Sequence, residues 1–300
     1  MLRLSACLLS CLTLSATRPV GPDTLVQPAA AGIPFGLIGM SGRNLVDPYT
    51  AAMQPARPES VLRDLAAARA RGNRLILSFA GGGAGNLTDG GGRFDYDRWK
   101  ARLDRFLPIT DQLNAYVADG TLFAAMLIDE PFVKHHWGGQ PVPMATLDRM
   151  AQYSKSLFPD LPTTVGSAPS TLKGYPWRYL DVSWAQYAAR KGPISEYAAS
   201  ETAAARSEGL GLFVGLNISQ GGDGSSGLGG DRDWSMSGAE ILEYGHALLD
   251  EPYACAFISW DNRPGVVDRP DVSQALQELA SAAKAHSETS CRQRARADSR

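Results

Sequence analysis

The chain has 300 residues, 44% of them hydrophobic and 20% charged, as is ordinary for a soluble globular protein. Its formal net charge of −2 gives no reason to expect nucleic acid or an anionic membrane as a partner. The length would fit two domains, but one α/β barrel commonly uses about 250 residues.

The first residues have the pattern of an export signal. Arg3 supplies a positive start, residues 4–14 form an apolar core, and a small-residue cleavage site ends at Ala16. The apolar core is too short for a membrane anchor. We therefore expect a signal peptide at 1–16, a linker rich in Pro, Gly and Ala at 17–32, and a secreted or periplasmic protein without a stable membrane span.

The four cysteines allow one alternative at this end of the chain. Cys7 and Cys11 each lie in a sequence that resembles a bacterial lipoprotein box, but either would leave an unusually short signal, so secretion is favoured over lipoprotein anchoring. The mature chain would keep Cys255, in an apolar strand pattern, and Cys291, in a basic tail at 287–300 that we expect to be disordered. A disulfide between these two is not favoured.

Strand-like and helix-like segments alternate from residue 33 to residue 286, and this order indicates an α/β fold with a parallel sheet. The expected strands are 34–40, 74–79, 122–129, 163–167, 182–187, 210–218 and 254–260. The expected helices are 60–71, 96–106, 110–118, 145–158, 193–207, 238–249 and 272–284.

We predict a single (β/α)8 TIM-type barrel at 33–286, with one strand irregular or missing and with 96–118 as the place where a short strand would hide. A doubly wound sheet is the rival, but it concentrates its ligand groups at one switch point. Here polar residues follow nearly every strand, and several strands carry small residues at alternate positions, as suits a crowded barrel interior.

The third expected strand ends in Asp129 and Glu130, followed by Pro131. The strand is apolar throughout, so it should be buried on both faces, and an acid pair at its carboxyl end lies where parallel α/β folds place their active sites. Neighbouring strand residues point to opposite faces. We therefore expect Glu130 to enter the pocket, and Asp129 to bind backbone or an arginine behind it unless the strand breaks at Pro131. Caps or salt bridges are the structural alternative for both.

Asp261 is the second candidate carboxylate. It closes the last expected strand after Ser259 and Trp260, and it faces the barrel axis if Ser259 does. Glycoside hydrolysis needs two carboxyl groups across the scissile bond, and Glu130 with Asp261 is the best pair available at strand ends. Asp261 could equally cap a turn before Pro264.

Aromatic and amide side chains near strand ends suit a sugar, because aromatic planes pack on the apolar faces of sugar rings and amides bind hydroxyls. Core packing explains about half of such aromatics. The candidate substrate-binding residues are Arg43, Asn86, Trp137, Trp184, Gln186, Tyr187, Asn217 and Trp260.

Several motifs are absent from the sequence. No His-x-His pair or His-Glu-x-x-His marks a metal site, no Gly-x-Ser-x-Gly elbow marks an esterase, and no phosphate-binding loop occurs. We expect neither metal nor organic cofactor. The glycine-rich segments 81–92 and 221–230 read as mobile or substrate-shaping loops.

Taken together, these patterns resemble the glycoside hydrolase-like (β/α)8 barrels of secreted bacterial proteins, a poorly characterised group, over roughly residues 33–285. The resemblance rests on the strand order and on the motifs Leu127-Ile128-Asp129-Glu130-Pro131, Trp184-Ala185-Gln186-Tyr187, Gly215-Leu216-Asn217 and Ile258-Ser259-Trp260-Asp261. It implies a Glu acid after a middle strand, which Glu130 matches. It also implies a second acid after a late strand, where this chain has Asp261 and the family more often has Glu.

The expected function is glycoside hydrolysis of an extracytoplasmic oligo- or polysaccharide by a monomer, with retention of configuration weakly favoured. A non-catalytic carbohydrate-binding barrel and a polysaccharide lyase with Tyr187 as base are the alternatives.

Overall fold

The computed structural model describes residues 32–81, 84–227, 233–287 and Cys291. The predicted signal peptide, the predicted linker up to residue 31 and most of the predicted basic tail lie outside the described residues. None of the helices in these ranges combines the length and the apolar character that crossing a membrane would require.

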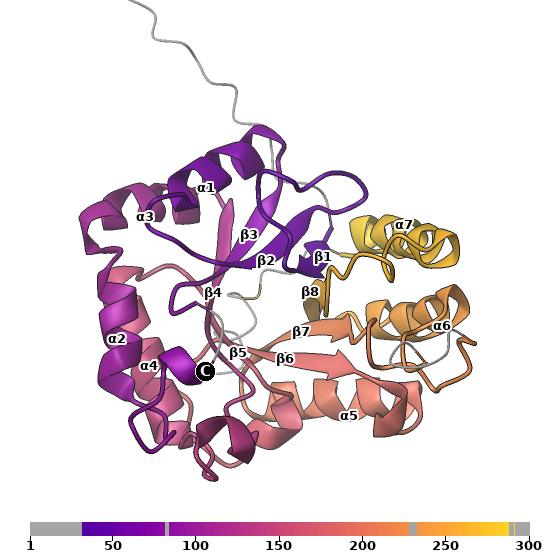
Figure 1. Ribbon diagram of the computed structural model, residues 1–300. Coiled ribbons are helices and arrows are strands. Elements are labelled where there is room, and N and C mark those ends of the chain that lie inside the picture. The colour runs from indigo at the N-terminus through magenta and orange to yellow at the C-terminus, as the bar shows by residue number, and fades with distance from the viewer. Residues whose placement is uncertain (1–31, 82–83, 228–232, 288–290, 292–300) are drawn as a thin grey trace, which may run out of the picture.

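The strands of the described chain form a closed parallel barrel, in which each strand pairs with its neighbour in sequence and β1 pairs with β8 (Figure 1). The predicted single α/β barrel is confirmed. The strands are β1 (Phe35–Ile38), β2 (Ala51–Pro55), β3 (Arg74–Ser78), β4 (Leu122–Asp129), β5 (Thr163–Gly166), β6 (Val182–Tyr187), β7 (Gly211–Leu216) and β8 (Ala254–Ser259).

The strand that sequence reasoning did not find is β2, and the expectation that it hides within 96–118 is wrong, because that segment is helical. β2 has the sequence Ala-Ala-Met-Gln-Pro, which lacks β-branched residues, and it follows β1 without an intervening helix. Its strand conformation comes from its place in the barrel, where it pairs in parallel with β1 on one side and β3 on the other.

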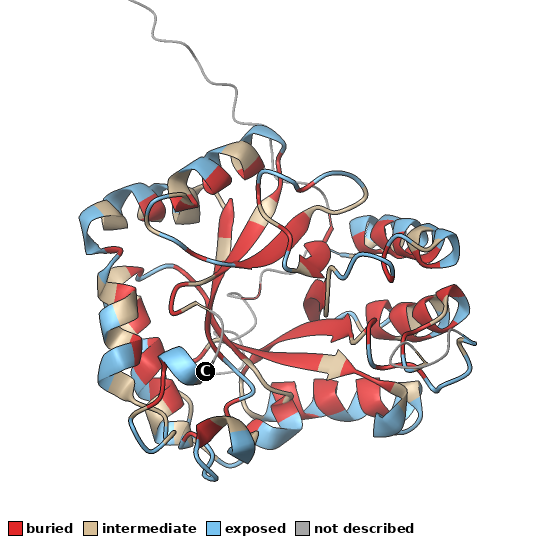
Figure 2. Cartoon of the chain, in the orientation of Figure 1, coloured by how far each residue is buried: buried red, intermediate tan, exposed pale blue. Residues whose placement is uncertain are grey.

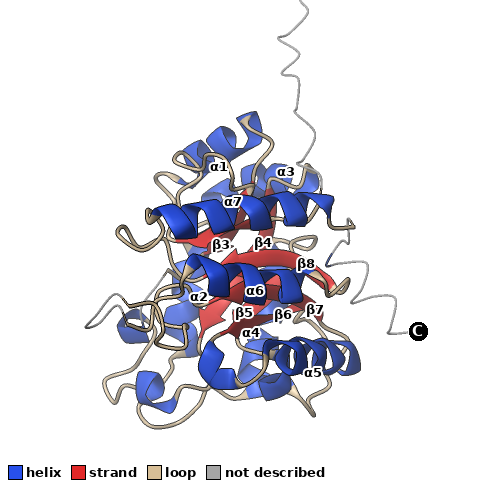
Figure 3. Ribbon diagram, turned by 90° about the vertical axis from the view of Figure 1, so that its right-hand side faces the viewer, coloured by secondary structure: helices blue, strands red, loops and turns tan. Residues whose placement is uncertain are grey.

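Helices surround the barrel and press their apolar faces on it, so that buried residues gather on the strands and on the inner sides of the helices (Figures 2 and 3). In the last helix the buried positions recur at helical spacing from Val272 to Ala283. The α-helices of the described ranges are α1 (Val61–Ala70), α2 (Tyr96–Asp104), α3 (Thr110–Ala118), α4 (Met144–Leu157), α5 (Ile194–Ser207), α6 (Gly238–Leu249) and α7 (Pro270–Ala285). Short 3₁₀ turns are η1 (Ala84–Asn86), η2 (Leu107–Ile109), η3 (Lys134–Trp137), η4 (Pro169–Leu172) and η5 (Ala189–Lys191).

The base of the barrel, at the amino ends of the strands, contains a disulfide. Cys255 of β8 and Cys291 are bonded with their Cα atoms 5.4 Å apart, and both belong to the apolar cluster that fills the barrel interior. The carbonyl of Cys291 lies beside Gly211 at the start of β7. The expectation against this disulfide is therefore wrong: a residue far along the chain returns to the interior.

Candidate active site at the mouth of the barrel

Two cavities open at the carboxyl ends of the strands and meet at Asp129, Glu130 and Trp260. The larger, of about 480 Å³, lies over β1 to β4, and we call it the apolar lobe. Its further walls include Ile38, Met53, Leu87, Met126, Ile128 and Trp137. The smaller, of about 340 Å³, lies over β5 to β7, and we call it the polar lobe. Its further walls include Ser167, Trp184, Gln186, Lys191, Asn217 and Gln220.

Asp129 and Glu130 both face the mouth, against the expectation that only one of them would. Asp129 is the last residue of β4, and Glu130 follows it with φ of 45°, the one positive φ of a non-glycine residue in the described chain. Met126 and Ile128 of β4 also line the apolar lobe, so simple alternation places Glu130 on the mouth side and leaves Asp129 out of phase. The pairing of β4 with β5 shifts register between Met126 and Asp129, and this irregularity accompanies the turn of Asp129 to the same side. The left-handed conformation of Glu130 costs about 1–3 kcal/mol and is often found at functional sites.

Backbone contacts hold this strained turn. The Glu130 N–H donates to Gly166 O at 3.1 Å, and Glu130 O accepts from Val133 N–H at 3.1 Å. The same oxygen accepts from the indole Nε1 of Trp137 at 2.9 Å. Trp137 is buried beneath the turn. Several independent contacts therefore hold the acid pair in one position.

The two carboxylates differ in their surroundings. Burial, and then the neighbouring charge of Glu130, raise the pKa of Asp129 from 3.8 to about 6. Solvent reaches Asp129 through the cavity, but protein encloses its other sides, and a Cβ placed on Gly166 would lie 1.9 Å from its Oδ1. Only glycine leaves room for this carboxylate. Glu130 is half-exposed, and its Oε2 lies 3.3 Å from Nδ1 of His136.

The polar lobe provides hydrogen-bonding groups around an indole wall. Trp184 is fixed by a bond from its Nε1 to Ile258 O of 3.1 Å. Gln186 and Asn217 line the lobe beside it, and Lys191 Nζ donates to the backbone oxygen of Gln186. Burial lowers the pKa of Lys191. The lobe can therefore bind hydroxyl groups through amides and through its two cationic residues, Arg190 and Lys191.

Asp261 does not line either lobe, which corrects its predicted place in the pocket. Ile258 and Trp260 face the interior, so Ser259, one residue out of phase, faces away, and its Oγ accepts from Leu216 N–H at 3.0 Å. The carboxylate of Asp261 accepts a hydrogen bond from Ser219 and lies 3.6 Å from Arg263 Nη2. Its contacts tie the loops after β7 and β8 together.

Three other predicted substrate-binding residues lie outside both lobes. Arg43 is held by Asp64, with Nε 2.7 Å from Oδ1. Asn86 lines a separate neighbouring cavity. Tyr187 points outward into the helical layer, where its hydroxyl donates to Gly192 O at 2.6 Å and burial raises its pKa. A lyase mechanism with Tyr187 as base is thereby contradicted. The predicted residues Trp137, Trp184, Gln186, Asn217 and Trp260 do line the lobes.

Sequence reasoning does not identify three residues that line the lobes: His136 and Gln54 of the apolar lobe and Lys191 of the polar lobe. His136 follows the acid pair by one short turn, which is a signal that could have been used. Gln54 was hidden by the missed strand β2. In the described residues no group of three His, Cys, Asp or Glu side chains forms a potential metal site.

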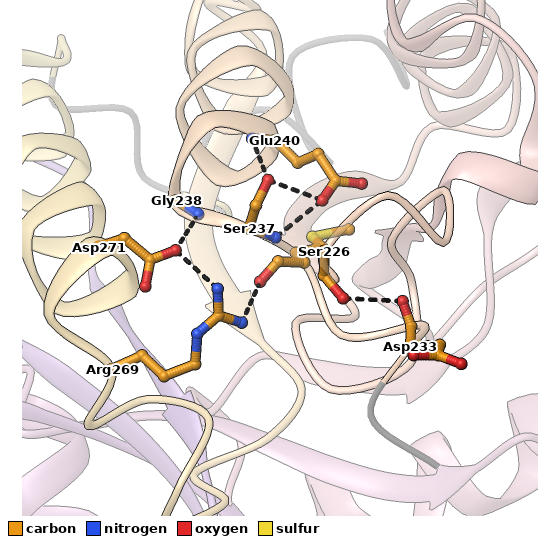
Figure 4. A network of polar contacts seen from close by, with 8 residues as sticks. Ser226, Asp233, Ser237, Gly238, Glu240, Arg269 and Asp271 are labelled. Carbon is orange, nitrogen blue, oxygen red and sulfur yellow. Dashed lines mark hydrogen bonds and ion pairs between the residues drawn. The ribbon is translucent and has the colours of Figure 1, made fainter. Parts of the chain in front are cut away.

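Hydrogen bonds and an ion pair hold the described ends of the loop between β7 and α6 in place (Figure 4). Ser237 caps α6 and exchanges hydrogen bonds with Glu240, whose other oxygen accepts from Asp223 N–H at 2.8 Å. Arg269 donates to Asp271 at 2.7 Å and to Met236 O at 3.1 Å. These contacts fix the stems of a segment predicted to be mobile, and residues 228–232 lie outside the described chain.

Solved structures with the same barrel include glycoside hydrolases. A cellulase–inhibitor complex matches with a TM-score of 0.53 and 13% identity, over 83% of this chain and 92% of that chain. An endo-beta-1,4-mannanase double mutant of Cellulomonas fimi matches with 0.53 and 15%, over 83% and 70%. The catalytic domain of the major endoglucanase from Xanthomonas campestris pv. campestris matches with 0.50 and 11%, over 86% and 95%. No family model matches the sequence, and no curated protein is significantly similar to it. The likeness therefore shows the (β/α)8 barrel fold that this chain shares with these enzymes.

Proposed function

We propose that the protein is a glycoside hydrolase that cleaves an extracytoplasmic glycan with Asp129 and Glu130. The observation that carries this proposal is the acid pair itself: two carboxylates, followed by a strained turn at Glu130, lie where an apolar and a polar cavity meet. Glycosidases of this kind work through carboxyl groups beside the scissile bond. Active sites of α/β barrels also lie at this end of the strands.

The acid pair can divide the roles of donor and base. A proton donor must hold its proton near the working pH, and the raised pKa of Asp129 suits that role. Asp129 gives its proton to the glycosidic oxygen as the carbon–oxygen bond breaks. Water then adds to the anomeric carbon, and Glu130 takes up the proton that the water loses. The products are two free hydroxyl ends, and no electron transfer is involved.

The lobes suit sugar units on either side of the acid pair. Trp137 and Trp260 line the apolar lobe, where an indole can pack on the CH face of a sugar ring. Gln186 and Asn217 of the polar lobe can bind hydroxyl groups. Because Asp261 lines neither lobe, it forms no carboxylate pair with Glu130 across the mouth, and retention of configuration is no longer favoured.

An extracytoplasmic location is part of the proposal. The export pattern at residues 1–16 supports it, and so does the disulfide between Cys255 and Cys291, because structural disulfides persist mainly in oxidising compartments.

The test is a glycan panel read by intact mass for the wild type, Asp129→Asn, Glu130→Gln and the matched control Asp261→Asn. We expect products from the wild type and the control, and at least a hundredfold lower rate from the two mouth variants. Wild-type rates in both mouth variants on a substrate with a poor leaving group would rule out this assignment.

A carbohydrate-binding barrel without catalysis is the second candidate. The observation that favours it is that, in the described chain, no carboxylate other than the acid pair lines either lobe. The wall facing β4 has Asn217 and Trp260 instead. Glycan binding that survives Glu130→Gln, with no cleavage of any glycan by the wild type, would select this candidate.

A further inference from the structure

A third cavity, of about 420 Å³, lies beside the apolar lobe and shares Pro55 and Gly81 with it. We call it the arginine cavity, because its walls include Arg57, Arg102 and Arg105. Asn86 and Glu59 complete its polar lining. The shared residues place it next to the apolar lobe, over β2 and β3.

The cavity carries an excess of positive charge. Three guanidinium groups face one carboxylate, Glu59, and in the described chain no carboxylate lies within 4 Å of any of the three. Elsewhere arginine is commonly paired with aspartate in this protein, as in the pairs Arg43–Asp64, Arg69–Asp119, Arg93–Asp89, Arg98–Asp95, Arg263–Asp261 and Arg269–Asp271. The arginine cavity therefore lacks the counter-charge that the fold supplies at those sites.

Arg102 is held in place for a ligand. Its Nε donates to the backbone oxygen of Ala80, which fixes the plane of the guanidinium. Gly81 adopts φ of 78°, which favours glycine, and a Cβ there would lie 2.7 Å from Nη2 of Arg102. Burial, followed by the charge of Arg105, lowers the pKa of Arg102. An anion in the cavity would stabilise the charged guanidinium and so oppose both effects.

The helix dipole is the competing explanation for these charges. Arg102 and Arg105 lie at the carboxyl end of α2, where cations are favoured. That explanation does not extend to Arg57, which comes from the segment after β2, or to the space that Gly81 leaves. A guanidinium matches the paired oxygens of a carboxylate or a sulfate, and convergent arginines are a usual means of binding such groups.

We propose that the arginine cavity binds an oxyanion carried by a sugar, either a uronate carboxylate or a sulfate ester, so that the substrate is an acidic glycan. Only the statement that the bound glycan is a substrate rests on the proposed function, because binding of the anion does not require catalysis. An acidic sugar in this cavity would place a neighbouring unit in the apolar lobe, next to Asp129 and Glu130.

The test is a nuclear magnetic resonance titration of arginine Nε–H signals in the full chain. The probes are glucuronate, galacturonate, glucose 6-sulfate and glucose. We expect saturable shifts at Arg102 with at least one acidic probe and none with glucose. A larger response to the uronates identifies a carboxylate ligand, and a larger response to the sulfate ester identifies a sulfated one.

Variants make the result specific. The double variant Arg57→Gln/Arg105→Gln changes exposed side chains and should weaken the acidic probe at least tenfold, whereas Arg63→Gln on the exposed side of α1 should not change it. Equal responses to glucose and to all acidic probes, no saturable response, or equal affinity in the double variant and the control would each overturn the proposal. Glu130→Gln should bind the acidic probe normally, since the anion is bound in a separate cavity. If the wild type binds the acidic probe but cleaves no glycan of the panel, the hydrolase alone is refuted.

Discussion

The two ends of the barrel differ in what their residues do. At the base, Cys255 and Cys291 are bonded inside an apolar cluster, and the chain there gains stability. At the mouth, Glu130 has a strained backbone and Asp129 a raised pKa, and the chain there gives up stability. The stabilising bond and the candidate site thus lie at opposite ends of the barrel, and α/β barrels generally have their active sites at the carboxyl ends of the strands.

The largest expected effect of a mutation is on turnover at the mouth. Glu130→Gln and Asp129→Asn should each lower kcat by a factor of about 10² to 10⁴, since each removes a group that moves a proton in the transition state. Substrate affinity should change far less. The measurement is steady-state kinetics on a cleaved glycan, with Asp261→Asn as control. A large change in KM with kcat intact would show that these groups only bind.

At the base, the expected effect is on stability. Cys291→Ser opens a loop with a sequence separation of 36 residues and should lower the free energy of unfolding by about 2–4 kcal/mol. Urea denaturation measures this, and kcat at a temperature where the variant is folded should stay unchanged. Adding reductant to the wild type should reproduce the loss. A variant as stable as the oxidised wild type would contradict the stabilising role of this bond.

The pH dependence of stability should reveal Asp129. Its raised pKa means that the folded state binds the proton more tightly than the unfolded state, so stability is highest below the ordinary value of 3.8 and falls as the pH rises to about 6. Solvent in the cavity screens the effect, and we expect a fall on the order of 1 kcal/mol. Asp129→Asn should lack this component in urea denaturation across that interval. An identical pH dependence in the variant would refute the shift.

The smallest effect should be on binding in the polar lobe. Gln186→Ala removes an amide that can bind one hydroxyl group and should raise KM about fivefold, equivalent to about 1 kcal/mol, with kcat little changed. Gln140→Ala, an exposed glutamine that lines neither lobe, is the matched control. A KM equal to that of the control would place the sugar elsewhere in the mouth.

Local patterns in the sequence predict most of the strands and helices of the barrel. The alternation of strands and helices predicts the barrel, and an apolar strand ending in Asp129 and Glu130 predicts an acid pair at its mouth. Trp184, Gln186 and Asn217 were found in the same way, because strand ends of a parallel barrel converge. β2 escaped because Ala51–Pro55 has little strand propensity of its own and is a strand through its two neighbours.

The sequence by itself determined the fold class and the strand end that carries the acid pair, since both follow from hydrophobic periodicity along short segments. Only the tertiary structure decided which way side chains face at the mouth. Trp260 lines both lobes and Asp261 lines neither, and the register of β4 shifts just before Asp129, which lies at the mouth beside Glu130. The tertiary structure also sets the pKa of Asp129 and the bond between Cys255 and Cys291. Both depend on segments distant in the chain, whose approach no local pattern encodes.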